Sequence, residues 1–410
     1  MKINYLKING FKSIRNVKLK DVSPFIVLAG ANGAGKSNFV DALVFLSKVI
    51  DMGVSKAVSE FGGIRNLIDP KLKSETVSYY IEFEIQEQIY QYRISILLTN
   101  LLSRIVQESL KIIKDGQEIF DSNKAREKLK EKQENNASGD WIAAGLLGAL
   151  GGLIWSGLKG SDQVGQDIAK GVVTGIGLKL LADEKHSSND SFLQPNNEAF
   201  QTLKNTKIFR IDPFAIKNRR NFVDNPEELK EDGSNIAAVL ENLEKDDELR
   251  EQVTEWMSVI VPEMTEISVK EQEIDDSRGL FFEEDSGSKF PAHMVSDGTI
   301  YALCLLVSIL TRTKQPGVTI IEEPERGLHP KAISELISFI REHTSSFHPI
   351  ILTTHSESVV RSLELTELYF VSKYQGKTQI KDVRNSGVDK SKIPLDTAWL
   401  TNLLGGGLPW

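Results

Sequence analysis

The chain has 410 residues, which is enough for two or three domains with full-sized hydrophobic cores. Its hydrophobic content of 40% and charged content of 26% are typical of soluble proteins, and a single cysteine, Cys304, excludes an internal disulfide framework. The net charge of −8 argues against a globally basic coat for nucleic acid, although it leaves room for a local basic channel.

The first third of the chain reads as strands and one helix. The N-terminal sequence MKINYLKINGFKSI lacks a secretion signal, so we expect a cytoplasmic protein. Residues 2–9 and 14–20 alternate between apolar and polar, and 25–30 form a short apolar run before a helical pattern. An antiparallel meander, with Asp115-Gly116 as a hairpin turn, is predicted for VSYYIEFEI, QYRISILL and RIVQESLKIIKDGQEIF.

The composition changes after residue 121. A charged stretch is followed by the uncharged WIAAGLLGALGGLIWSGL at 141–158, by KGVVTGIGLKLLA at 170–182 and by a polar segment that we expect to be a flexible loop. Ordinary globular composition returns near residue 204. The sequence therefore predicts one catalytic domain interrupted by an insertion, with three parts at 1–121, 122–203 and 204–410.

The last part alternates between helical and strand patterns. The segment LKEDGSNIAAVLENLEK begins a helical pair, while VTIIEE and PIILTTH read as buried strands of the parallel type. Further helices are predicted at 299–313, 331–343 and 356–363.

A glycine-rich motif marks a phosphate-binding loop (P-loop) between the strand at 25–30 and the following helix. It matches GxxxxGK[ST], and its residues are Gly30, Ala31, Asn32, Gly33, Ala34, Gly35, Lys36 and Ser37. In such a loop the backbone N–H groups surround the phosphates, and the helix N-terminus adds its positive dipole. We expect Lys36 to reach the β- and γ-phosphates of ATP and Ser37 to bind Mg²⁺.

Polar residues follow both buried strands of the last part. Glu322 and Glu323 end VTIIEE, where Glu322 would hold Mg²⁺ directly or through water and Glu323 would polarise the attacking water. His355 ends PIILTTH and could contact the γ-phosphate, although a lone histidine is more often structural. In MVSDGTIYALCLL the turn at Ser296 opens a helix, which suits either an anion site or an ordinary helix cap.

The order of these motifs resembles ATP-binding-cassette ATPases of the RecF/SMC branch, and more narrowly the stand-alone ATPases related to overcoming-lysogenisation-defect proteins. The resemblance rests on GANGAGKSN, VSDGTIYALCLL, IIEEPERGLHP and TTHSES, with YLKINGFKSI and DGSNIAAVL in support. It covers roughly 1–120 and 205–405. It implies an α/β P-loop ATPase head with a mixed sheet, an antiparallel subdomain and a helical subdomain, to which this chain adds the glycine-rich helical insertion.

The resemblance also implies roles for individual residues. Lys36, Ser37 and Asn38 would belong to the ATP and Mg²⁺ site, Glu323 would be the catalytic carboxylate, and His355 would be the switch histidine. Further residues near the nucleotide would be Lys12 and Ser13, and the signature turn of Ser296 and Gly298 would reach the γ-phosphate of the opposite protomer.

Two positions depart from the family pattern. Glu322 replaces the usual aspartate, and SDGT replaces the SGGQ typical of transporters, which favours a dimerising switch over a pump. The glutamine of the Q-loop is not identified, and Gln86, Gln88 and Gln91 remain alternatives.

The resulting functional hypothesis is an ATP hydrolase that dimerises on ATP, as a homodimer or higher oligomer, and serves as a switch or scaffold. Its output would be directed at nucleic acid, in anti-phage defence or DNA repair, through a separate effector protein. The alternative is the ATPase subunit of a membrane transporter or membrane-acting effector. A structural ATP binder without turnover is a third hypothesis, against which Glu323 and His355 argue.

The insertion and one basic run leave alternatives open. The 18 uncharged residues at 141–158 would span about 27 Å as a helix, and two GxxxG spacings follow from the glycines at 148, 152, 171 and 175. Packing or oligomer contact is favoured over docking of a partner and over membrane insertion, and Lys170 and Lys179 in the second segment weaken a model with two membrane spans. The basic run KNRRNF at 217–222 could contact DNA phosphates or form a solvated loop.

Overall fold

The computed structural model describes residues 2–69, 75–85, 87–99, 103–124, 127, 198–218, 227–271 and 278–404. The chain divides into two compact units. The first comprises Met1–Ser23, Ser37–Thr206 and Lys373–Ile380, and the second comprises Pro24–Lys36, Lys207–Ser372 and Lys381–Trp410.

The first unit contains a six-stranded antiparallel sheet with the order β2-β1-β4-β5-β6-β7. Its strands are β1 Lys2–Asn9, β2 Val17–Val22, β4 Thr76–Ile85, β5 Gln88–Leu98, β6 Ser103–Lys114 and β7 Gln117–Asp121. The predicted meander is confirmed. Asp115 and Gly116 both have positive φ (50° and 73°) and join Lys114 to its partner Gln117, as a tight two-residue hairpin requires.

The second strand begins at Val17, three residues later than predicted. Between β1 and β2 the chain closes a tight turn, in which Gly10 N–H donates to Ile14 O at 2.9 Å and Ile14 N–H donates to Phe11 O at 2.7 Å. The turn requires positive φ at Gly10 (79°) and Lys12 (46°). The alternating pattern at 14–20 therefore begins at the end of this turn, three residues before the strand itself.

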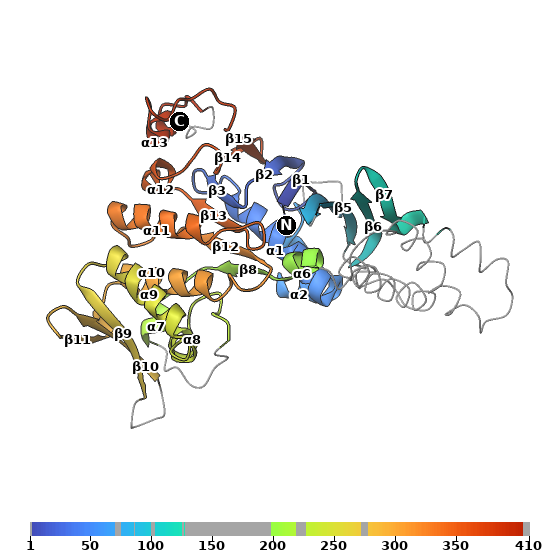
Figure 1. The fold of residues 1–410 in the computed structure, drawn as a ribbon. Helices are drawn as coiled ribbons and strands as arrows, with labels where there is room; N and C mark the ends of the chain where they lie inside the picture. Colours follow the sequence, from blue (N-terminus) through green and yellow to red (C-terminus); the bar gives the residue numbers. More distant parts are fainter. Residues whose placement is uncertain are drawn as a thin grey trace, which may run out of the picture. The chain divides into compact units, whose positions relative to one another are not determined.

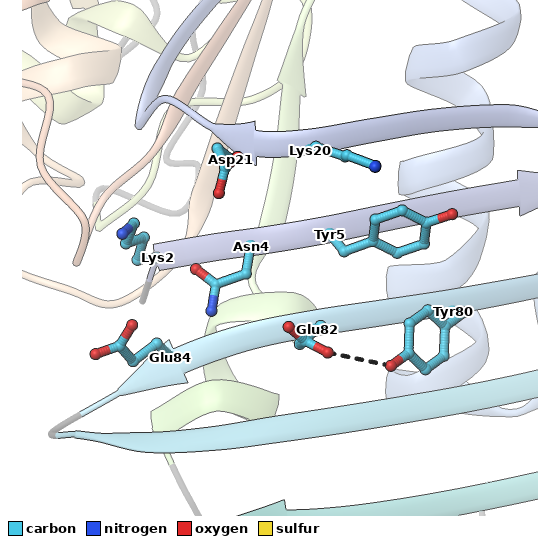
Figure 2. A pocket seen from close by; sticks show the side chains of 8 residues that line it. All are labelled: Lys2, Asn4, Tyr5, Lys20, Asp21, Tyr80, Glu82 and Glu84. Carbon is cyan, nitrogen blue, oxygen red and sulfur yellow. Dashed lines mark hydrogen bonds between the residues drawn. The ribbon is translucent and has the colours of Figure 1, made fainter. Parts of the chain in front are cut away.

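One face of this sheet is polar and partly exposed. Figure 2 shows a shallow depression on it, at which β1, β2 and β4 contribute side chains and the Tyr80 hydroxyl donates to Glu82 Oε2 at 3.2 Å. The lining residues are Lys2, Asn4, Tyr5, Lys20, Asp21, Tyr80, Glu82 and Glu84. The other face carries the buried members of the alternating pattern, such as Tyr79, Ile81 and Phe83 in β4.

The helices of the first unit are α1 Lys36–Met52, α2 Val54–Glu60, η1 Ile64–Asn66 and α6 Glu198–Lys204. Phe11, Phe45 and Phe61 form an aromatic cluster with ring centroids 5.5–6.5 Å apart, which ties α1 and the β1–β2 turn together. Ser47 Oγ donates to Lys204 O at 2.6 Å, so the start of the third predicted part of the chain lies against α1.

A second six-stranded sheet has the order β15-β14-β3-β13-β12-β8, and most of its residues belong to the second unit (Figure 1). Its strands are β3 Phe25–Ala29, β8 Thr206–Phe209, β12 Val318–Glu322, β13 Ile350–Thr354, β14 Leu368–Tyr374 and β15 Lys377–Asp382. The pairs β12–β13, β13–β3 and β3–β14 are parallel. As predicted, β3 and β13 are buried along their whole length.

Helices of the second unit share one hydrophobic core with this sheet. They are α7 Pro213–Asn218, α8 Ile236–Leu243, α9 Asp247–Ile260, η3 Ala292–Met294, α10 Asp297–Leu310, α11 Pro330–Glu342, α12 Glu357–Arg361 and α13 Leu395–Leu400. In α10 every residue from Gly298 to Leu310 is buried, which explains why this helix is apolar on all sides. The three helices predicted after residue 298 are confirmed, with ends shifted by one or two residues at most sites.

A small antiparallel sheet with the order β11-β10-β9 was not predicted. It consists of β9 Met264–Glu271, β10 Arg278–Glu284 and β11 Lys289–Pro291, and it lies beside α8 and α9 in Figure 1. Its strands are short and rich in glutamate and lysine, so the apolar alternation is weak.

Most of the predicted insertion lies outside the described residues, including both glycine-rich segments. In the part of the chain that the structure describes, no helix is long and apolar enough to cross a membrane.

Candidate nucleotide site

The P-loop connects β3 to α1 and lies at the carboxyl ends of the parallel strands. Gly30 N–H donates to Thr354 O at 3.2 Å, and a Cβ on Gly30 would lie 2.2 Å from Val371 O, so only glycine fits between β13 and β14. Gly33 and Gly35 have positive φ (76° and 107°). A Cβ on Gly33 would meet open space, so the backbone here is accessible to a ligand.

Lys36 folds back over this loop. Its side chain is buried, and Nζ donates to Gly30 O at 2.6 Å and to Ala31 O at 3.1 Å. Burial lowers the pKa of Lys36, while the nearby charges of Glu323, Glu325 and Glu322 oppose that shift. The ammonium group therefore lies within electrostatic range of the carboxylates at the end of β12, and among the described residues its acceptors are two loop carbonyls.

Glu322 is the last residue of β12, as predicted. Its Oε2 accepts a hydrogen bond from Arg210 Nε at 2.6 Å, and Arg210 Nη1 also contacts Glu231 Oε1 at 2.7 Å. Glu322 Oε1 is buried, and among the described residues it has no hydrogen-bond partner. Arg210 was not predicted, because it follows β8, a strand that the sequence analysis did not identify.

Glu323 has a left-handed backbone conformation with φ of 53°, which is rare for residues with a side chain. Its N–H donates to Thr353 O at 2.8 Å. The hydroxyl of Tyr301 donates to the carbonyl oxygens of Glu322 at 2.8 Å and Glu323 at 3.0 Å. Neighbouring elements thus hold this strained backbone, and Tyr301 is a second contributor that the motifs did not indicate.

The structure brings Glu323 and His355 together. His355 Nδ1 lies 3.2 Å from Glu323 Oε1, while Arg326 Nη2 lies 3.1 Å from Glu323 Oε2. The glutamate side chain is 29% exposed and the histidine side chain 45% exposed, so both are accessible to water. Such a pair can accept a proton from a water molecule at the edge of the sheet.

Glu325 is a third carboxylate at this edge and was not singled out from the sequence. Its side chain is buried, and Oε1 accepts a hydrogen bond from Thr354 Oγ1 at 2.7 Å. Burial raises the pKa of Glu325 despite its hydrogen bonds. A glutamate two residues after Glu323, within the same motif, is the sequence signal that points to it.

The described residues contain no group of three or more His, Cys, Asp or Glu side chains that could hold a metal ion. The buried, unpartnered Oε1 of Glu322 is nevertheless an oxygen ligand of the kind that Mg²⁺ prefers. These residues therefore fit a Mg²⁺ ion that draws most of its ligands from nucleotide phosphates and water.

The remaining predicted nucleotide residues belong to the first unit. Ser37 follows Lys36 in the first turn of α1 and is exposed. Asn38 Nδ2 donates to Ser13 Oγ at 2.5 Å, Ser13 Oγ shares a hydrogen bond of 2.6 Å with Thr378 Oγ1, and Lys12 Nζ pairs with Asp41 at 2.6 Å. Lys12 and Ser13 thus have protein partners in this structure, and their role at the nucleotide stays a prediction.

The signature turn caps α10. Ser296 Oγ accepts from Thr299 N–H at 3.1 Å, and Lys217 Nζ donates to Val295 O and Asp297 Oδ1, both at 2.6 Å. A Cβ on Gly298 would lie 2.1 Å from Gly327 O, so contacts within the chain already require glycine there. Lys217 opens the basic run at 217–222, whose residues 219–222 lie outside the described residues.

The Q-loop alternatives are not decided. Gln88 and Gln91 both lie in β5, where Gln88 Oε1 accepts from Tyr90 and Gln91 Nε2 donates to Glu82. Gln86 lies outside the described residues.

Three comparisons show which known proteins this chain is similar to. The profile of the family described as "AAA domain, putative AbiEii toxin, Type IV TA system" matches residues 25–144 and 175–361. The DNA replication and repair protein RecF of Rickettsia prowazekii (strain Madrid E) is 26% identical over 110 residues, which make up 25% of this chain and 30% of RecF. The chain thus matches less than a third of the length of this relative.

The third comparison is with a crystal structure of an Smc head bound to the C-terminal winged-helix domain of ScpA. It aligns with a TM-score of 0.50 at 16% identity, and the alignment covers 93% of this chain and 98% of the head. The fold is therefore that of an Smc-type α/β ATPase head with a mixed and an antiparallel sheet. The predicted resemblance to RecF and SMC ATPases is confirmed.

Proposed function

The chain belongs to this AAA-domain family, and from that premise we propose that it hydrolyses ATP with Glu323 as the general base and uses the cycle to switch between separate and paired heads. The chain contains a P-loop ATPase domain of the RecF and SMC head type. The residue roles, the pairing and the output are the proposal.

The observation that carries the proposal is the contact of 3.2 Å between His355 Nδ1 and Glu323 Oε1. Both residues follow parallel strands that adjoin the P-loop strand, β13 directly and β12 one position further. Glu323 would take a proton from the attacking water as its oxygen bonds to the γ-phosphorus, while the bond between that phosphorus and the leaving oxygen of ADP breaks. His355 would keep its contact with Glu323 and would donate a hydrogen bond to the γ-phosphate.

Lys36 and the loop backbone would bind the phosphates. Phosphate oxygens are stronger acceptors than the carbonyls of Gly30 and Ala31, so Nζ would exchange these partners for them. Ser37 and Glu322 would hold Mg²⁺, which would supply positive charge beside the phosphates. For Glu322 to bind the ion, the hydrogen bond from Arg210 to its Oε2 must leave part of the carboxylate free.

The signature turn is the proposed contact with a second copy. Ser296 is exposed, and the adjacent Met294 is 65% exposed, so the turn presents a partly apolar surface. A head bound to ATP would meet this surface on its partner, giving a homodimer or higher oligomer that hydrolysis releases. The description of the family, a toxin–antitoxin system, and the partial likeness to RecF support an output in defence or DNA repair.

A separate effector protein is the expected partner, with DNA as a further ligand. This expectation is supported by analogy: the Smc head with a similar fold is bound to another protein, ScpA, in its crystal structure.

The test uses Glu323→Gln, with Lys36→Ala as a control that should lose ATP binding altogether. Glu323→Gln should bind ATP with near wild-type affinity, turn it over about 100-fold more slowly or worse, and double its mass with ATP in light scattering. Proteins that co-purify with this variant from its native host would identify the effector. Normal turnover would place the base elsewhere.

A further inference from the structure

We propose that Glu325 is a positioning residue for hydrolysis: its buried carboxylate fixes the loop after β13 so that the ring of His355 stays on Glu323. The inference rests on the proposed function, because it concerns the same hydrolytic step. Glu325 lies within the segment IIEEPERGLHP, in which the sequence analysis assigned roles to Glu322 and Glu323 alone.

Glu325 is hydrogen-bonded to the side chain of Thr354, the last residue of β13, and to the backbone of His355, which follows it. Its Oε1 accepts from Thr354 Oγ1 at 2.7 Å and from His355 N–H at 3.3 Å. Thr354 Oγ1 in turn accepts from Ser356 N–H at 2.9 Å. One carboxylate oxygen therefore holds a hydrogen-bonded chain that determines where the peptide of His355 lies.

The ring of His355 faces two carboxylates through one nitrogen. Nδ1 lies 3.2 Å from Glu323 Oε1 and 3.8 Å from Glu325 Oε1. Two carboxylates on the same side favour a proton on Nδ1, and they leave Nε2, on the opposite side of the ring, to meet substrate. The arrangement matches what a histidine that contacts the γ-phosphate requires.

The burial of Glu325 is hard to explain by stability alone. Its side chain is 9% exposed, and Oε2 is buried without a hydrogen-bond partner among the described residues. A buried carboxylate oxygen without a hydrogen-bond partner lowers the stability of the folded chain. If this residue served only to cap the loop, a neutral side chain would do so without that cost. Lys36 lies within electrostatic range, so the position also adds negative charge near the phosphate site.

The experiment compares Glu325→Ala, Glu325→Gln, His355→Ala and the double variant Glu325→Ala/His355→Ala. Glu342→Ala, at the exposed end of α11, is the matched control. Three quantities are measured: the Kd of a fluorescent ATP analogue, the kcat of ATP hydrolysis, and the rate at which diethyl pyrocarbonate modifies His355, read by mass spectrometry.

Glu325→Ala should leave the Kd within about twofold, lower kcat about 10- to 100-fold and raise the modification rate of His355, because the loop loses its anchor. Glu325→Gln should retain most activity, since its amide oxygen can still accept from Thr354. The double variant should be no slower than His355→Ala, because both changes disable the same group.

The inference would be overturned if the kcat losses of Glu325→Ala and His355→Ala multiplied in the double variant. It would also be overturned if Glu325→Ala left the modification rate of His355 unchanged. The modification assay needs no turnover. It therefore tests Glu325 even if Glu323→Gln shows that the base lies elsewhere.

Discussion

Replacing Tyr301 by phenylalanine should destabilise the protein and slow ATP hydrolysis. The hydroxyl of Tyr301 is the only atom removed, and it donates to the carbonyl oxygens of Glu322 at 2.8 Å and Glu323 at 3.0 Å. Tyr301 is 1% exposed, and phenylalanine keeps the same ring, so the space left behind is no larger than the lost hydroxyl group.

The size of the effect follows from the two carbonyls that lose this donor. A net hydrogen bond contributes about 1 kcal/mol, and a buried polar group without a partner costs about 1–3 kcal/mol, so we expect a loss of about 1–3 kcal/mol. The same hydroxyl helps to hold the left-handed backbone of Glu323, whose φ is 53°. A small relaxation there would move the carboxylate and lower kcat by about tenfold.

Urea unfolding and ATP turnover measure the two effects. The midpoint should fall with an unchanged m-value, because the surface exposed on unfolding stays the same. Tyr374→Phe, which removes a hydroxyl from a residue that is 61% exposed, should change neither quantity. If Tyr301→Phe behaves like Tyr374→Phe, the hydroxyl does not hold the end of β12 and the reasoning is refuted.

Two further predictions concern the core and the signature turn. His348 is buried, with Nε2 2.8 Å from Thr319 Oγ1, and burial together with Arg312 lowers its pKa from 6.5 to about 4. The unfolded chain therefore binds a proton that the folded chain does not, so the free energy of unfolding should fall by about 3 kcal/mol as pH drops from 6.5 to 4. His348→Gln should flatten that dependence in chemical denaturation, and an equally steep dependence would assign it to other groups. Ser296→Arg should retain ATP affinity but prevent the ATP-dependent doubling of mass in light scattering; a doubled mass would contradict pairing through the signature turn.

The local pattern of the chain was sufficient for several elements. Alternating residues predicted β4 and β5, and an apolar run followed by GANGAGKS predicted β3, the P-loop and α1. These signals are local because side-chain direction in a strand and backbone freedom at glycine depend on neighbours in sequence. The start of β2 shows the limit, since the alternating pattern begins at Ile14 whereas the strand begins at Val17.

Several strands were missed, and β14 was among them although it opens with the buried apolar run LYFV. The sequence analysis did not identify β8, β14 or β15, and it did not identify the small sheet of β9–β11. Their pairing depends on partners far along the chain, which periodicity in a short window does not report. Missing β8 also concealed Arg210, because the neighbour of β12 in the sheet was unknown.

The sequence by itself determined the chemistry of this protein: a P-loop, two glutamates after an apolar strand, and a histidine after the next. Only the tertiary structure decided what constrains them. Arg210 meets Glu322 across 112 positions of the chain, Tyr301 supports the backbone of Glu323, and Glu325 becomes a buried carboxylate held by Thr354. These contacts depend on which strands and helices become neighbours, and that choice is made by the packing of the whole core rather than by any one motif.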